Sequence, residues 1–260
     1  MSKIPKIIHF CWLSGEKYPP LIEKCIESWH KIMPDYEIIC WDKQRFDCDS
    51  VPFVKEACSV KKWAFAADYI RLYALYNYGG IYLDSDVFVF KRLDKFLDYR
   101  VFSGIEYCLS SASFTCHIEA AIIGAEKRNP YIKKCLEYYE NRPFILSDGS
   151  FDQTICPKIL AATAARYYGF KHTPHHQLLA GDICICAPEV FAHAYIETCS
   201  LKNTYAIHLC EGGWYKKEKD IPAIKKICKR GASLFRRFGS HPYKTIWMLY
   251  WHYKLGKNFK

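Results

Sequence analysis

The sequence predicts an α/β domain with a mostly parallel sheet flanked by helices. From the first residues onward, short apolar runs of strand type alternate with longer segments of helical spacing. Such alternation is typical of a parallel sheet with helices on its faces. Half of the 260 residues are apolar and a quarter are charged, so a core can form and global disorder is excluded. Because no short period runs through the chain, collagen-like, coiled-coil and low-complexity architectures are excluded as well.

The first elements follow from apolar spacing and from glycine and proline positions. Residues 4–10 form an apolar run, and a helical face with Cys25 and Trp29 follows the turn at Pro19 and Pro20. A long helix with closely spaced apolar residues ends at a Gly-Gly pair, since glycine commonly ends helices. We expect strands at residues 4–10, 36–41, 81–83 and 87–90, and helices at residues 21–32, 51–59 and 62–78.

The second half of the chain continues the pattern up to about residue 215. We expect strands at residues 101–106, 120–124, 182–187 and 205–209, and helices at residues 130–140 and 153–168. Residues 216–260 then differ in charge: they hold 13 Lys and Arg against 2 Asp and Glu, which leaves a net charge of −1 for residues 1–215. The sequence therefore predicts a near-neutral catalytic or binding domain at 1–215 and a basic, aromatic-rich helical tail at 216–260.

The basic tail has the composition of a membrane-surface segment. Its lysines and arginines are interleaved with apolar residues, and Trp247, Tyr250 and Trp251 belong to an aromatic cluster near its end. Such a helix suits an anionic membrane interface, so we expect this surface as a partner. The alternative is a helical layer that packs on the domain and leaves an ordinary basic face in solvent. We expect no nucleic-acid partner, because no further basic groove is visible in the body.

Cysteine spacing and the first residues bear on the compartment. The chain has 14 cysteines but no C-x-x-C pair, and Cys184 and Cys186 alternate as strand residues do. We therefore expect reduced thiols packed as small hydrophobic groups and no zinc site. The start lacks a small-residue cleavage site, and no apolar run reaches the roughly 18 residues of a membrane span. We expect a cytoplasmic protein that is peripheral on the inner face of the plasma membrane.

Two carboxylates in Asp84-Ser85-Asp86 are the first candidates for chemistry. Residues i and i+2 of a strand point to the same side, so both carboxylates can face one ligand. Aspartate disfavours strands, and its presence between two apolar tripeptides is typical of a functional site. The pair suits Mg²⁺ or Mn²⁺. The other copy of the pattern, Asp47-Cys48-Asp49, lies in a polar stretch, and we expect it to be a solvated loop.

The preceding helix adds an acid and a base. Asp68 and Arg71 stand at i and i+3 and so share a helix face. One interpretation is a surface ion pair worth a few tenths of a kcal/mol. The other interpretation is a partly buried pair, because the neighbouring residues are apolar; such a pair could hydrogen-bond polyhydroxylated or phosphorylated ligands. Residue types alone do not decide between the two interpretations.

Together these segments resemble a known family. IPKIIHFCW near the start, YEIICWD at 36–42, AFAADYIRLYALYNYGGIYLDSDV at 64–87 and YAIHLCEGGW at 205–214 are similar to glycosyltransferase family 32. That family shares its DXD signature with fungal mannosyltransferases, α-1,4-galactosyltransferases and, more distantly, clostridial glucosylating toxins. The resemblance covers about residues 3–214. D-x-x-R, a Gly-Gly turn and Y-L-D-x-D at fixed spacing are far more restrictive than D-x-D alone.

The resemblance implies a GT-A fold, a nucleotide-sugar donor, with a UDP-hexose favoured over a GDP-hexose, and bound Mn²⁺ or Mg²⁺. It places Cys11 and Trp12 at the nucleotide base, although core packing is the alternative for Trp12. The sugar and ribose contacts it implies are Asp68, Arg71, Tyr82 and Asp84. It assigns Asp86 to the metal with Asp84, leaves His208 or Glu211 to complete the metal shell, and places Trp214 in a loop that closes over the diphosphate.

Three further residues are candidates for contact with the acceptor or the anomeric carbon, alongside Asp84 and Asp86 as catalytic groups. Glu119 precedes an apolar strand. Asp152 is a candidate helix N-cap, which alone would explain its presence, and Gln153 would lie just inside the helix.

The activity implied is that of a retaining, metal-dependent hexosyltransferase. Its expected acceptor is a glycan or a lipid-linked oligosaccharide of a bacterial capsule or other surface polysaccharide. Two alternatives stay open: a catalytically silent module that binds nucleotide sugar or membrane, and a transferase with a protein acceptor.

Overall fold

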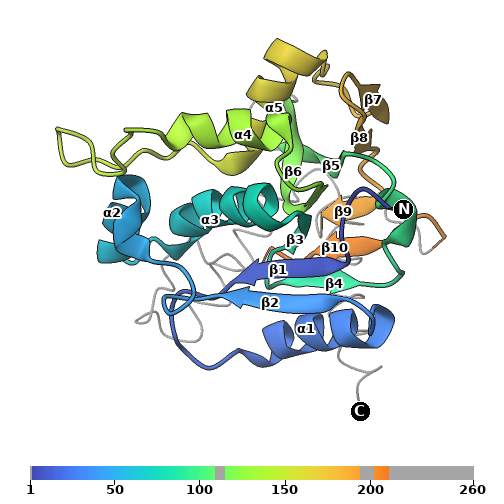
Figure 1. Ribbon diagram of the computed structural model, residues 1–260, viewed down its shortest axis with the longest axis horizontal. Coiled ribbons are helices and arrows are strands. Elements are labelled where there is room, and N and C mark those ends of the chain that lie inside the picture. The colour runs from blue at the N-terminus through green and yellow to red at the C-terminus, as the bar shows by residue number, and fades with distance from the viewer. Residues whose placement is uncertain (1, 109–114, 194–201, 211–260) are drawn as a thin grey trace, which may run out of the picture.

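The computed structural model describes residues 2–108, 115–193 and 202–210, and these form two sheets with helices packed around them (Figure 1). The larger sheet has seven strands. In spatial order they are β2 (Glu37–Trp41), β1 (Ile7–Cys11), β3 (Gly80–Leu83), β6 (Thr115–Ala125), β5 (Val101–Cys108), β8 (Ile183–Cys186) and β7 (Gln177–Leu179). The smaller sheet consists of β4 (Val87–Val89), β10 (Ala206–His208) and β9 (Phe191–His193).

Strand direction confirms the predicted fold class. β1 pairs in parallel with β2 and with β3, and β5 pairs in parallel with β8. β6 is antiparallel to both of its neighbours, and β7 is antiparallel to β8. Five of the seven strands therefore run in one direction, which makes a mixed sheet of mostly parallel strands.

Helices cover both faces of this sheet, and a core lies on each. α1 (Pro20–Ile32) packs with the smaller sheet on one side, where the indole of Trp29 is fully buried and donates to the Val87 carbonyl over 2.8 Å. The other face carries α2 (Pro52–Ser59), α3 (Trp63–Tyr78), α4 (Pro130–Leu136) and α5 (Cys156–Tyr168). Figure 1 shows α1 separated from α3 and α4 by the strands β1 and β2. Three short 3₁₀ turns are Cys48–Ser50, Asp94–Phe96 and Glu137–Tyr139.

Some predicted boundaries were wrong, for local reasons. Strand β1 begins at Ile7 rather than at residue 4, because the amides of Lys3 and Ile4 bond to the Leu97 carbonyl outside the sheet. The helix expected at 130–140 ends as a 3₁₀ turn after Leu136. The short strands β7 and β9 were not predicted, because three residues are too few to show a period.

The Gly-Gly pair after α3 sets how the long helix meets the sheet. Gly79 has φ 71° and ends the helix, its amide donating to the Leu75 carbonyl. Gly80 has φ 109°, and a Cβ there would lie 2.6 Å from the Ile7 carbonyl oxygen. Only glycine allows β3 to enter the sheet this close to β1. The tight Gly79–Gly80 turn thus connects α3 directly to β3, the strand that precedes Asp84.

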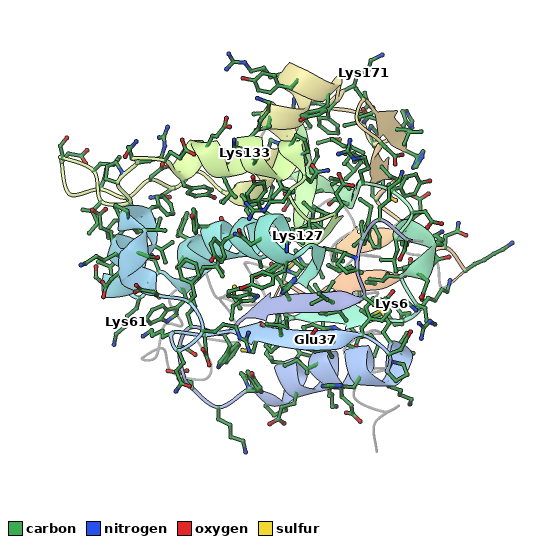
Figure 2. All side chains as sticks on the ribbon, viewed as in Figure 1. Lys6, Glu37, Lys61, Lys127, Lys133 and Lys171 are labelled. Carbon is green, nitrogen blue, oxygen red and sulfur yellow. The ribbon has the colours of Figure 1, made fainter. Side chains whose placement is uncertain are left out.

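The two ends of the central strands differ in chemistry. Figure 2 labels Lys6 and Glu37 at the start of β1 and β2, where the Glu37 amide donates to the Lys6 carbonyl over 3.0 Å. Asp84 follows β3 at the opposite, carboxyl end.

Among the described residues, no helix is both long and apolar enough to span a bilayer. Residues 216–260 lie outside the described residues, so the division at 215 stays a prediction.

Candidate active site

Asp84, Ser85 and Asp86 connect the two sheets. They join β3 of the larger sheet to β4 of the smaller one. They lie between the two strands expected at 81–83 and 87–90, but in a turn, so the strand alternation invoked for the two carboxylates does not apply. The Val87 amide closes the turn on the Asp84 carbonyl over 2.9 Å. The Asp84 amide donates to Ala121 in β6, and Asp86 accepts from the Leu209 amide after β10. The turn, not strand alternation, therefore brings the two carboxylates together.

His208 completes this cluster from β10, which pairs with β4 so that His208 faces Val87. Its Nε2 lies 3.3 Å from Asp86 Oδ1 and 3.9 Å from Asp84 Oδ2. One ligand atom from each of these three side chains lies within 4.8 Å of the others. On the far side of the ring, Nδ1 lies 3.7 Å from Oε1 of Glu119, a buried residue of β6.

Asp68 and Arg71 form a buried pair beside the cluster, which decides between the two interpretations that the sequence left open. Arg71 Nη2 lies 2.7 Å from Asp68 Oδ1 and 3.4 Å from Asp84 Oδ1, and both members of the pair are at most 3% exposed. Arg71 Nη1 donates to the Ala120 carbonyl over 2.8 Å. Asp68 Oδ2 accepts from the Cys156 amide at the start of α5. The guanidinium therefore links α3 to β6 and to the Asp84 turn.

Tyr82 in β3 and Cys11 at the end of β1 lie next to this pair in the sheet. The Tyr82 hydroxyl donates to Asp84 Oδ1 over 3.0 Å, and the Arg71 guanidinium stacks 4.7 Å from the centre of its ring. Cys11 is the last residue of β1 and lies at the same carboxyl edge of the sheet. Burial raises the pKa of Cys11, so its thiol stays protonated at neutral pH.

Burial and neighbouring charges shift the pKa values of the ionisable groups around the site. Burial raises the pKa of Asp68 to about 6 although Arg71 opposes the shift, and burial also raises the pKa of Asp84. For His208, burial lowers the pKa, but Cys210 and Asp86 outweigh it and the net shift is upward. Among the described residues, the carboxylates of Asp86 and Glu119 also lie within 4 Å of the His208 ring nitrogens. Carboxylates gathered in a desolvated place suit a bound cation.

The donor set fits a hard divalent ion. Carboxylate oxygens are ligands of Mg²⁺ and Mn²⁺, and an imidazole nitrogen shifts the preference toward Mn²⁺. Asp84, Asp86 and His208 are the described residues that could hold it. The alternative ligand Glu211 and the loop residue Trp214 lie outside the described residues.

Trp12 lies at the same carboxyl edge as the cluster, directly after β1. It is half-buried, its indole nitrogen donates to the Glu16 carbonyl over 2.6 Å, and its ring packs edge-on against Tyr18 with centroids 4.9 Å apart. The other D-x-D copy is an exposed turn, as its polar context predicted: Asp47 accepts from the Asp49 amide, and the Asp49 carboxylate is 75% exposed beside Lys55.

Asp152 and Gln153 depart from their expected place. α5 begins at Cys156, so Asp152 is not its N-cap and Gln153 lies before the helix with its side chain exposed. Asp152 instead accepts from the Thr154 amide, a local turn that competes with helix initiation. Its other carboxylate oxygen accepts from the Tyr138 hydroxyl over 2.9 Å. These contacts give Asp152 a structural role between α5 and the segment after α4.

A family comparison agrees with this geometry. Residues 19–103 match the family model described as the glycosyltransferase sugar-binding region containing a DXD motif. That span includes Asp68, Arg71, Tyr82, Asp84 and Asp86. Over this span the chain is similar to that DXD-containing region.

Curated relatives match part of the chain. Inositol phosphoceramide mannosyltransferase 3 of Schizosaccharomyces pombe is 37% identical over 105 residues, which are 38% of this chain and 28% of that protein. Mannosyl phosphorylinositol ceramide synthase CSH1 of Saccharomyces cerevisiae is 29% identical over 152 residues, 55% of this chain and 38% of that protein. The match thus spans less than two fifths of the length of either relative.

Solved structures give more distant likenesses. The galactosyltransferase LgtC in complex with donor and acceptor sugar analogues is 15% identical, with a TM-score of 0.46 over 87% of this chain and 95% of that one. A glycosyltransferase involved in glycosylation of the major capsid of PBCV-1 is 16% identical, with a TM-score of 0.46 over 80% and 94%. At this similarity they bear on neither substrate nor mechanism.

Two contacts around the DXD region escaped the sequence analysis. The Cys156 amide, which fixes Asp68, comes from a helix start 88 residues away, and no local pattern connects the two. Cys210 was also missed: its thiol donates to the His208 carbonyl over 3.5 Å. Its place two residues after His208 was the available signal, since a residue so near in sequence remains near in space.

Proposed function

We propose that this protein is a metal-dependent glycosyltransferase of GT-A type that moves a hexose from a nucleotide-diphosphate sugar to a hydroxyl acceptor. The observation that carries the proposal is the convergence of Asp84, Asp86 and His208 within 4.8 Å beside the buried Asp68–Arg71 pair. A ligand in this place would meet oxygen and nitrogen donors for a cation together with groups that bind sugar hydroxyls.

Asp86, Asp84 and His208 would hold Mn²⁺ or Mg²⁺. When bound, the ion supplies positive charge that stabilises the leaving diphosphate, so no protein acid is needed for its departure. Glu119 accepts from the Ala121 amide over 2.8 Å and faces His208 Nδ1, and we assign it to orient the imidazole. Glu119 would therefore contact a metal ligand, and not the ion or the acceptor.

Arg71 and Asp68 would hold the hydroxyl groups of the donor sugar. Their mutual contact and their backbone partners fix both side chains before any ligand arrives, so little conformational entropy is lost on binding. Tyr82 holds Asp84 through its hydroxyl and therefore helps orient a cation ligand. Cys11 and Trp12 lie at the same strand edge and are our candidates for the nucleotide base.

The acceptor is proposed to be a glycan or a lipid-linked glycan. The names of the fungal relatives support a mannosyl donor sugar and a phosphoinositol-bearing lipid as acceptor. They give no support to the bacterial polysaccharide setting that the sequence resemblance suggested. Retention of anomeric configuration, attachment through residues 216–260 to the inner face of a membrane, and a cytoplasmic location are proposals at the same level.

The test is a thermal-shift panel of UDP- and GDP-sugars, each with and without Mn²⁺, on the full chain. A ligand that binds the native state raises the melting temperature by mass action. We expect one nucleotide class to stabilise the wild type only when Mn²⁺ is present, and Asp86→Asn to abolish that shift. The matched control is Asp47→Asn in the exposed D-x-D copy, which should behave as the wild type. An equal loss in both variants, or no shift with any donor, would refute the site.

A second measurement separates an enzyme from a silent binding module. Release of the nucleoside diphosphate from the stabilising donor is followed over hours, because active glycosyltransferases also transfer the sugar slowly to water. Metal-dependent release that Asp86→Asn removes supports transfer chemistry. Tight binding without any release would leave a nucleotide-sugar binding protein and overturn the enzymatic assignment.

A further inference from the structure

A second group of metal-ligating side chains lies at the far edge of the larger sheet. His176, Cys184 and Cys186 each offer one ligand atom, and these atoms lie within 4.8 Å of one another. The order of strands places three neighbouring steps, β3 to β6 to β5 to β8, between Asp84 and these cysteines. At the usual strand spacing this is about 14 Å, so the two groups do not share a ligand. Figure 1 shows β7 and β8 away from α1 and β2.

The sheet itself explains why these three side chains meet. Cys184 and Cys186 are two residues apart in β8 and therefore point to the same face. β7 runs antiparallel to β8 with Gln177 opposite Ile185 and Leu178 opposite Cys184. Continued by one residue, the same register places His176 opposite Cys186. Directly opposed residues of an antiparallel pair have Cβ atoms about 5 Å apart, within reach of a shared ion.

We propose that His176, Cys184 and Cys186 form a binding site for a thiophilic divalent cation, with Zn²⁺ as the ion that fits best. Two thiolates and one imidazole are ligands that zinc takes in proteins, and they differ from the oxygen-rich set at Asp84. The two sulfur atoms lie 3.7 Å apart. Tetrahedral zinc with Zn–S bonds of about 2.3 Å separates two sulfur ligands by about 3.8 Å. The thiols thus already have the spacing that the ion requires.

Burial and access differ among the three side chains. Both cysteines are at most 3% exposed, whereas His176 is exposed and gives an ion access from solvent. Three protein ligands leave the fourth position of a tetrahedral ion to water or to an added ligand.

The proposal differs from the expectation of no zinc site, which rested on sequence spacing alone. C-x-C without a nearby partner is a weak signal, and the histidine stands directly before the neighbouring strand β7, eight residues before Cys184. A bound ion would tie the three-residue edge strand β7 to β8. β7 needs such support, since its Leu178 is 63% exposed and adds little to the core.

The experiment is a Co²⁺ titration of the reduced, metal-free full chain, followed by displacement with Zn²⁺. Co²⁺ bound by thiolates gives an intense near-ultraviolet charge-transfer band that oxygen ligands do not give. All measurements are made in the wild type and in Asp86→Asn, so that the Asp84–Asp86 site cannot supply the signal. In both proteins we expect the thiolate band to correspond to one bound Co²⁺ per chain. One equivalent of Zn²⁺ should then remove the band.

Variants assign the ligands. Cys184→Ser and Cys186→Ser should lose the band, and Cys58→Ser should keep it. Cys58 is the matched control because it is a free cysteine of α2, on an element that contains neither β7 nor β8. His176→Ala changes an exposed side chain and should fold, with Co²⁺ affinity weaker by roughly tenfold or more. No thiolate band, a band that survives Cys186→Ser, or an unchanged affinity in His176→Ala would overturn the proposal. Loss of the band in Cys58→Ser would do the same.

Discussion

His9 should make the stability of the protein depend on pH between its folded and its ordinary pKa. It is fully buried in β1, its Nε2 lies 2.8 Å from the Gly79 carbonyl oxygen, and the Trp41 indole donates to its Nδ1 over 3.1 Å. A carbonyl only accepts and an indole only donates, so the ring is neutral with its proton on Nε2. Protonation at Nδ1 would break the tryptophan hydrogen bond and place a charge in the core.

The magnitude follows from the pKa. Burial lowers the pKa of His9 from its ordinary value of 6.5 to about 4. Below pH 6.5 the unfolded chain therefore binds a proton that the folded chain refuses, and the free energy of unfolding falls as the pH falls toward 4. Each pH unit in that window costs about 1.4 kcal/mol, which gives a loss of about 2 kcal/mol between pH 7 and pH 5.

The assay is urea unfolding at pH 7 and pH 5, compared between the wild type and His9→Gln. Glutamine is neutral at both pH values and can donate to Gly79. The comparison is needed because Asp68 acts in the opposite sense: its pKa is raised to about 6, so its contribution to stability is lost as the pH rises. Subtracting the variant isolates His9, and His30→Gln, at an exposed position, should resemble the wild type. Equal losses in the wild type and His9→Gln would refute the reasoning.

Three other predictions concern the backbone, the donor site and the tail. Gly80→Ala should lower the free energy of unfolding by about 2 kcal/mol or more, because it adds a clash with Ile7 to an unfavourable φ. Gly149→Ala, with φ 79° and open space, is the control in urea unfolding and should cost at least about 1 kcal/mol less. Arg71→Lys should weaken metal-dependent donor binding roughly tenfold or more in the thermal-shift assay, because lysine cannot reach Ala120 and Asp84 together. Arg92→Lys, in an exposed ion-pair cluster, should have no such effect, and equal effects would contradict the role of Arg71. Truncation after Lys219 should reduce sedimentation with anionic vesicles more than it reduces donor hydrolysis; unchanged sedimentation would exclude the membrane role of the tail.

Most of the fold was predictable because its signals are local. The helix over residues 21–32 and the strand over 36–41 are confirmed within one residue as α1 and β2, since apolar spacing and flanking prolines act over short distances. The wrongly predicted start of α5 also has a cause close by in the sequence. Asp152 was interpreted as a helix cap, but the Asx turn to Thr154 and the proline at position 157 together start the helix three residues later than expected.

The site was predictable only in part, because half of it depends on strand pairing. Asp68, Arg71 and Asp84 lie within 17 residues of one another, and the helix, the glycine turn and the strand bring them together. The contact between His208 and Glu119 is different. It exists because β10 pairs with β4 while β6 pairs with β3, and neither register can be deduced from one sequence.

The two D-x-D copies show what distinguishes a site from a pattern. Both Asp47 and Asp84 are followed by a turn, so local backbone geometry does not separate them. What differs is the connection that each turn makes. Asp47 begins a solvent-exposed 3₁₀ turn, whereas Asp84 and Asp86 bridge two sheets and receive an imidazole from a third segment. Desolvation at that junction strengthens every charge interaction, so the same tripeptide gains affinity for a cation only where two sheets meet around it.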